Sequence, residues 1–306
     1  MQLAGDGEAT HKATTWSREW RLPDGVGTFL LLLPGLVFFV VLFVLPATTA
    51  VTRSFTDRET DSFSWVNFQT FLGDANGWGI LGYTLGLATA ATLVAALISL
   101  PLAEILRHRP PGNRFFRLLI ISPLLLPGIV NAFGLYLLFE RWGWFNKFLV
   151  DVVPFISTPW EITNTTPGLI FFYAIVLFPF TAINALAAME AIDPSLEEAA
   201  AVSGAGPWLR FRHVILPGAA RGIIAGSIMT FVMCFGALSI PLILGGELAR
   251  NILSFEVYRN AVVFGKWELA SAIAVIMGLV QLIAIGAYLA LAQGSFARGA
   301  VEREAG

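Results

Sequence analysis

The longest polar stretch between two apolar runs is residues 190–218, and we call it the polar hairpin. Asp193 and Pro194 are favoured where a helix begins, because an aspartate side chain accepts a backbone N–H there and a proline loses no hydrogen bond. Glu197 and Glu198 follow early in this helix, where carboxylates suit the positive end of the helix dipole. The stretch therefore predicts a short helix that presents two carboxylates at the membrane surface.

The rest of the polar hairpin predicts a turn and a second helix. Gly204 can adopt the left-handed conformation that ends a helix, and Gly206 and Pro207 can begin another. Leu216-Pro217 is expected to close that second helix, because proline cannot continue the hydrogen-bond ladder.

The sequence indicates no nucleotide, metal or catalytic site. Gly265-Lys266 is the only Gly-Lys pair, but Trp267 follows it and Asn260 stands where the first glycine of a P-loop belongs, so there is no Walker A motif. The single cysteine, Cys234, lies in an apolar run and excludes an intramolecular disulfide. Three histidines are scattered in polar segments: His11, His108 and His213. We expect no catalytic residue, metal or cofactor in this chain.

The composition is that of a membrane protein. The chain has 306 residues, of which 56% are hydrophobic and 13% charged, and its mean hydropathy is +0.73. Soluble domains carry about 25% charged residues. The net charge of −2 argues against nucleic acid as a partner.

Six apolar runs are long enough to cross a bilayer core of about 30 Å, which needs about 20 residues each. They are residues 28–51, 80–106, 118–139, 168–189, 219–244 and 269–292. The first run is longer than the hydrophobic region of a signal peptide, so we expect an uncleaved span. The sequence therefore predicts an all-α polytopic membrane protein. Its six-helix domain, residues 28–292, is flanked by tails at 1–27 and 293–306.

The distribution of Lys and Arg predicts the orientation, because these residues accumulate in short cytoplasmic loops. With the N-terminus inside, 12 of the 19 Lys and Arg residues lie in cytoplasmic segments and 7 lie outside. Both termini and the polar hairpin are therefore expected in the cytoplasm.

The polar hairpin resembles the EAA loop of the permeases of type I ABC importers. The match consists of Glu198-Ala199-Ala200, Gly204-Ala205, Phe211, Val214 and Leu216-Pro217, with Ser203 where the family usually has Asp. In that family the loop is a coupling helix that sits in a cleft of a cytoplasmic ATPase.

The resemblance implies the fold of a type I importer permease and a set of partners. These would be a second, similar or identical permease subunit, two ABC ATPase subunits that bind ATP and Mg²⁺, an extracytoplasmic solute-binding protein and membrane lipid. The ATPase contact would be made by Glu198, Ala199, Ala200, Ser203, Gly204, Ala205, Phe211, Leu216 and Pro217. The protein would be a multi-pass component of the cell inner membrane and would itself hydrolyse no ATP.

Further motifs extend the resemblance over most of residues 28–292. Trp65-Val66-Asn67-Phe68 resembles the W-x-NF element of these permeases, and Gly143 to Asn146 resembles their G-x-x-N element. Residues 235–246 resemble the permeases of the polyamine, iron, sulfate and phosphonate group. Sugar permeases share the first two elements, so a sugar or glycerol phosphate stays an alternative solute.

A translocation pathway needs weakly polar groups within the spans, because they replace part of the hydration of a solute without trapping it. We select Asn131, Tyr136, Ser227 and Thr230 as candidates. For each of them, hydrogen bonding between helices is an alternative of at least equal weight. Gly218, Gly222 and Gly226 recur every fourth residue and are interpreted as a ridge for helix packing.

Two other classes of protein, a proton-coupled carrier and a membrane-bound enzyme, are less consistent with the sequence. A proton-coupled carrier normally buries an ionisable residue at mid-membrane depth, whereas Glu104 lies near a helix end, where a pair with Arg107 at i+3 is favoured. A membrane-bound enzyme would need clustered His, Asp or Glu, which the sequence lacks.

Overall fold

The computed structural model describes residues 26–152 and 158–304. Its first unit ends at Thr49 and its second begins at Ala50. Helices make up the regular structure of the described residues, apart from one isolated bridge between Thr56 and Phe63. The predicted all-α class is confirmed.

The first unit consists of an apolar helix whose side chains are exposed from Phe29 onward. Helix α1 (Val26–Phe39) continues through a π-helical turn (Val40–Val44) into α2 (Leu45–Ser54). The π turn shifts the hydrogen-bond register by one residue immediately before Pro46, so the helix passes a residue that has no N–H to donate. This helix is long and apolar enough to span a membrane. The predicted N-terminal tail, residues 1–27, lies outside the described residues except for Val26 and Gly27.

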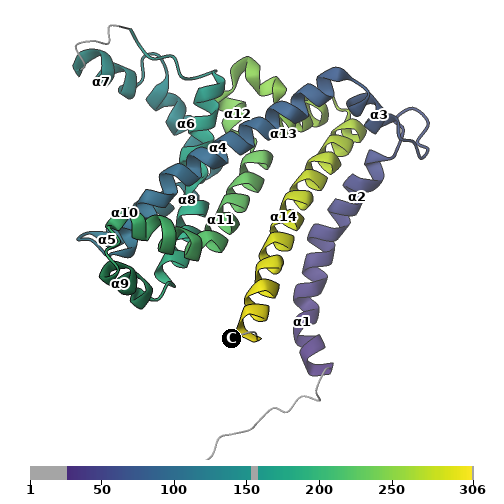
Figure 1. Ribbon diagram of the computed structural model, residues 1–306. Helices are drawn as coiled ribbons and strands as arrows, with labels where there is room; N and C mark the ends of the chain where they lie inside the picture. The colour runs from purple at the N-terminus through teal and green to yellow at the C-terminus, as the bar shows by residue number, and fades with distance from the viewer. Residues whose placement is uncertain (1–25, 153–157, 305–306) are drawn as a thin grey trace, which may run out of the picture. The chain divides into compact units, whose positions relative to one another are not determined.

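Three long helices form the centre of the second unit and run side by side (Figure 1). They are α4 (Ala75–Arg107), α8 (Thr166–Glu190) and α11 (Leu216–Gly236). A Cβ atom at Gly226 would lie 2.8 Å from the Cα of Thr181, and one at Gly222 would overlap the Cβ of Ala188. These glycines let α11 approach α8 closely, which confirms that the ridge serves packing.

Other helices of the second unit pack on this centre and on one another. Helix α14 (Trp267–Glu304) packs on α11, on α13 (Leu253–Tyr258) and on α3 (Val66–Leu72), while α12 (Ser239–Leu244) packs on α6 (Gly128–Phe139). Two clusters of buried side chains result, one near the polar hairpin and one toward the opposite end of α8.

The third expected span, residues 118–139, is broken. Helix α5 (Asn113–Leu125) and the helical stretch that begins at Gly128 enclose a bend of 106°. The bend lies at Leu126, whose backbone is extended, and at Pro127, because the residue before a proline is driven out of the α-helical region. The described residues thus hold five helices able to span a membrane, or six if the bent pair counts as one span. The expectation of six spans is met only if the bent pair of helices is counted as one span.

The fifth expected span, residues 219–244, is wrong at both ends. A continuous helical stretch runs from Pro207 to Gly236, and α12 is a separate short helix beyond the break. The carbonyl of Ala237 at this break accepts hydrogen bonds from Tyr173 Oη (3.1 Å) and Ser254 Oγ (2.9 Å). Two hydroxyls on other helices thereby donate to a carbonyl that has no hydrogen-bond partner within its own helix.

The described helix α14 also continues to Glu304, past residue 292 where the last expected span ended. The backbone of the predicted C-terminal tail, residues 293–306, is therefore helical as far as Glu304.

Candidate functional site

The first half of the polar hairpin folds as its sequence dictates. Helix α9 (Pro194–Val202) starts after Asp193, whose carboxylate accepts the backbone N–H of Ser195 at 2.9 Å. This hydrogen bond lowers the pKa of the Asp193 carboxyl. The predicted N-cap and the predicted proline at the first helical position are both confirmed.

The turn of the polar hairpin is a Schellman motif. Gly204 has φ = 85°, and its N–H bonds the carbonyl of Ala201, while the N–H of Ala205 bonds the carbonyl of Ala200 at 3.0 Å. Gly206 then has an extended backbone and precedes α10 (Pro207–Arg210). The predicted left-handed turn at Gly204 and the restart at Pro207 are confirmed.

The predicted end of the second helix at Leu216-Pro217 is wrong. Helix α10 continues through a π-helical turn (Phe211–Ile215) into α11, and the N–H of Leu216 bonds the carbonyl of Phe211. The π turn shifts the register of the backbone hydrogen bonds, so the helix continues past Pro217, as it does past Pro46. Because the helix is continuous, the polar hairpin is joined directly to the span α11.

The outer face of the polar hairpin is exposed and carries both charge and apolar surface. Glu198, Ala199, Ser203, Gly204 and Pro217 are exposed, and Ala200, Ala205, Phe211 and Leu216 are half-buried. Two apolar side chains that the sequence analysis did not select are also exposed: Val202 at 90% and Trp208 at 68%. The Trp208 ring stacks on Phe211 at a centroid distance of 5.8 Å. Exposed apolar residues next to a carboxylate are typical of a protein contact surface.

The inner side of α9 is held by Arg107, the last residue of α4. Its guanidinium bonds Glu104 at 2.7 and 2.8 Å and bonds both carboxylate oxygens of Glu197, at 2.9 Å for Oε2. Hydrogen bonds from Arg107, with weaker contributions from the charges of His108 and Arg210, lower the pKa of the Glu197 carboxyl. The expected pair of Glu104 with Arg107 is confirmed, whereas the bond from Arg107 to Glu197 was not foreseen.

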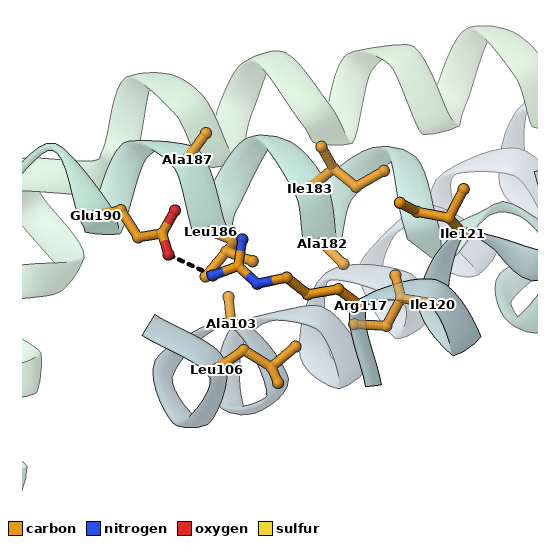
Figure 2. Close-up of a pocket in the computed structure, with 10 residues that line it drawn as sticks. All are labelled: Ala103, Leu106, Arg117, Ile120, Ile121, Ala182, Ile183, Leu186, Ala187 and Glu190. Atoms are coloured by element: carbon orange, nitrogen blue, oxygen red, sulfur yellow. Dashed lines mark hydrogen bonds and ion pairs between the residues drawn. The ribbon is translucent and has the colours of Figure 1, made fainter. Parts of the chain in front are cut away.

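A second arginine ties α5 to the end of α8. Figure 2 shows Arg117 reaching across a small apolar pocket of about 150 Å³ to an ion pair with Glu190. The pocket is lined by Ala103, Leu106, Ile120, Ile121, Ala182, Ile183, Leu186 and Ala187. This pair joins α5 to α8, and that of Arg107 joins α4 to α9.

Two of the four expected pathway residues lie in α6. Asn131 donates to the carbonyls of Pro123 (2.7 Å) and Leu126 (3.3 Å), so it bridges the bend between α5 and α6. Tyr136 lines a polar hollow of about 370 Å³ at the end of the bundle opposite the polar hairpin. The other lining residues of this hollow are Glu140, Arg141, Glu161, Thr163, Asn164 and Thr165.

The other two expected pathway residues lie in α11. Ser227 is half-buried. Thr230 is fully buried, and its hydroxyl bonds that of Thr181 on α8 at 2.8 Å. The hydroxyl of Thr230 therefore joins two helices and is not open to a solute in this structure, so we leave Thr230 out of the proposed pathway.

Two buried asparagines of the recognised sequence elements organise loops. Asn67 donates to the carbonyls of Ser54 (3.1 Å) and Thr56 (2.9 Å). Asn146 is 1% exposed and bonds four backbone groups: the carbonyls of Phe139, which ends α6, and of Glu140, and both the carbonyl and the N–H of Trp160 in the loop before α8. Among residues 26–152 and 158–304, no group of three or more His, Cys, Asp or Glu side chains could hold a metal ion.

The site and the fold together define a membrane subunit of a transport system. Residues 93–297 match the family described as the binding-protein-dependent transport system inner membrane component, and the chain belongs to this family of ABC importer permeases. It is accordingly a multi-pass protein of the inner membrane. The alternatives of a proton-coupled carrier and a membrane-bound enzyme are not retained.

Relatives named as transport permeases agree with this family assignment. The chain is 32% identical to the inner membrane ABC transporter permease protein YdcU of Escherichia coli K12, over 89% of this chain and 90% of that one. It is 29% identical to the spermidine/putrescine transport system permease protein PotB of the same organism, over 81% and 93%. A chain of a bacterial ABC transporter that imports the acidic polysaccharide alginate superposes with a TM-score of 0.72 over 87% of this chain and 94% of that one. Its sequence identity is 17%, so this likeness concerns the fold alone.

Proposed function

We propose that this chain forms half of the solute pathway of an ATP-driven importer and that its polar hairpin is the coupling element. The observation that carries this proposal is the exposed face of Glu198, Val202 and Trp208, presented on a hairpin continuous with α11 and bonded to α4. Such a face suits docking into a cleft of a cytoplasmic ATPase.

The proposed assembly contains two permease subunits, two ABC ATPases and a solute-binding protein on the other side of the membrane. ATP and Mg²⁺ bind to the ATPases, which carry out the hydrolysis. Closure of the ATPases moves the two polar hairpins and turns the cavity between the permeases from inward-facing to outward-facing. This arrangement requires both termini of the chain in the cytoplasm.

For the solute, we propose a small cation of the polyamine class. Relatives named for spermidine and putrescine transport support it, as does the polar hollow beside Tyr136, because Glu140 and Glu161 place two carboxylates against the single guanidinium of Arg141. Arg141 lies 3.7 Å from Glu161, and both side chains are largely exposed, so this pair is weak. Tyr136, Asn131 and Ser227 are the proposed pathway residues.

Other solutes stay open as alternatives. Iron, sulfate and phosphonate are transported by permeases of the same group. A sugar or glycerol phosphate is the second candidate, favoured by the W-x-NF and G-x-x-N elements at Asn67 and Asn146.

The test is uptake into proteoliposomes that contain the permease together with an ABC ATPase and a solute-binding protein encoded in the same genome. We expect ATP-dependent uptake of spermidine or putrescine, and a reduced rate when Glu140 and Glu161 are both replaced by Gln. Uptake of sulfate or a sugar instead would refute the polyamine proposal alone. Transport by the permease without any ATPase would refute the proposed function as a whole.

A further inference from the structure

The contact between Arg107 and Glu197 joins two parts of the chain that are 90 residues apart in sequence. The guanidinium uses Nε and Nη2 for Glu104, and Nη1 and Nη2 for Glu197, so all four carboxylate oxygens are bonded. The three side chains are 12%, 25% and 18% exposed for Arg107, Glu104 and Glu197. Charged hydrogen bonds shielded from water to this degree are stronger than pairs on an open surface.

Helix α9 has little other attachment to the spans. Every residue of α9 is at least partly exposed, and its main packing partners are α10 and the π turn (Phe211–Ile215) of the same hairpin. Its apolar side chains face outward, with Leu196 at 55% and Val202 at 90% exposure. The bonds of Glu197 to Arg107 are therefore the principal polar connection between α9 and α4.

Helix α4 continues from this contact to the opposite end of the bundle. The hydroxyl of Thr84, which is 1% exposed, accepts the backbone N–H of Leu253 at the start of α13 at 3.0 Å. At 1.5 Å per residue, Thr84 and Arg107 are about 35 Å apart along the helix. Helix α4 therefore connects the Arg107 contact with the start of α13.

We propose that Arg107 is a positioning residue that transmits displacement of the polar hairpin to α4. The inference rests on the proposed function, in which an ATPase drives that displacement. Covalent continuity moves α8 and α11 with the hairpin, and α4 packs on both of them. The bonds of Arg107 to Glu197 add a direct connection between α9 and the end of α4. Without this link the ATPase still docks on the exposed face of α9 and hydrolyses ATP, but less solute crosses for each ATP consumed.

The experiment compares Arg107→Gln with Arg114→Gln in the complete reconstituted importer. Arg114 is an exposed arginine in the neighbouring α5, so its replacement removes the same charge from the same end of the bundle. We measure ATPase binding to the permease, solute-stimulated ATP hydrolysis and the number of solute molecules transported for each ATP.

Arg107→Gln is expected to leave ATPase binding within about twofold of wild type and to lower the transport ratio at least about fivefold, the lower end of ordinary coupling between sites. Arg114→Gln is expected to keep the wild-type ratio. The exchange Arg107→Glu with Glu197→Arg is expected to recover part of the loss, which would not happen if the loss came from a defect unrelated to this pair. A wild-type ratio in Arg107→Gln, or an equal loss in Arg114→Gln, overturns the inference.

A second variant covers the case in which Arg107→Gln does not fold. Glu197→Gln is close to isosteric and keeps the bonds between Arg107 and Glu104, so it removes only the charge on α9. This variant is expected to lower the number of solute molecules transported for each ATP. A wild-type value of that ratio overturns the inference. Failure of the wild-type permease to bind any ATPase has a different meaning, because it refutes the proposed function and the inference falls with it.

Discussion

The conformation of Gly204 allows the role of the hairpin turn to be tested with one pair of identical substitutions. Gly204 and Gly206 both have open space around the position of a Cβ atom, but only Gly204 has a positive φ, of 85°. A serine at position 204 costs about 1–2 kcal/mol, because a side chain disfavours the left-handed region. A serine at position 206 costs little, since the backbone there is extended and serine is a good N-cap for α10.

If docking requires the Schellman turn, Gly204→Ser should weaken binding of the ATPase by up to about 5–30-fold, the factor that corresponds to 1–2 kcal/mol. Gly206→Ser should bind as wild type does. The assay is titration of the ATPase onto permease held in lipid nanodiscs, followed by measurement of solute-stimulated ATP hydrolysis. Equal affinities for the two variants would show that docking does not depend on the Schellman turn, because both variants add the same side chain and only Gly204 has a positive φ.

Three further predictions concern stability and pH. Gly226→Ala should lower the melting temperature in detergent, because overpacking costs about 1–3 kcal/mol. Gly278→Ala, at a position with open space, should leave the melting temperature unchanged. Equal melting temperatures for the two variants would contradict this. Asn146→Ala should cost about 1–3 kcal/mol in the same assay, because it leaves buried backbone groups without partners. The pKa of Glu197 is lowered by Arg107, so the pair is intact above the ordinary glutamate pKa of about 4.3 and is lost as pH falls through the lowered value. Hydrogen-exchange protection of α9 should therefore persist down to the ordinary glutamate pKa and fall only below it in wild type. Loss of protection near pH 6 would contradict the assignment.

The features that the sequence predicted correctly are those determined by a few neighbouring residues. The N-cap at Asp193, the left-handed turn at Gly204 and the restart at Pro207 each depend on the conformational preference of one residue. The pair of Glu104 with Arg107 was predictable for the same reason, since residues three apart on a helix are neighbours.

The features that were missed depend on contacts between distant segments. Nothing near Glu197 in sequence indicates that Arg107 is its partner. Pro217 suggests a helix end, but the preceding π turn lets the helix continue, and that adjustment has no simple sequence signal. The choice between a pathway role and a bond between helices was left open for Thr230, because α11 is apolar on most of its surface and periodicity does not show which side faces another helix.

The most direct test of the central claim is the side of the membrane on which the polar hairpin lies. Cys234 is 4% exposed and should first be replaced by Ala, and single cysteines are then placed at the exposed positions Ser203 and Ser62. The Lys and Arg distribution predicts that Ser203→Cys reacts with a membrane-impermeant maleimide only in inside-out vesicles and is shielded when the ATPase is bound. Ser62→Cys should instead react from the outside of intact cells once the outer envelope is permeable. Labelling of position 203 from outside would contradict the account, because no cytoplasmic ATPase could then reach the polar hairpin.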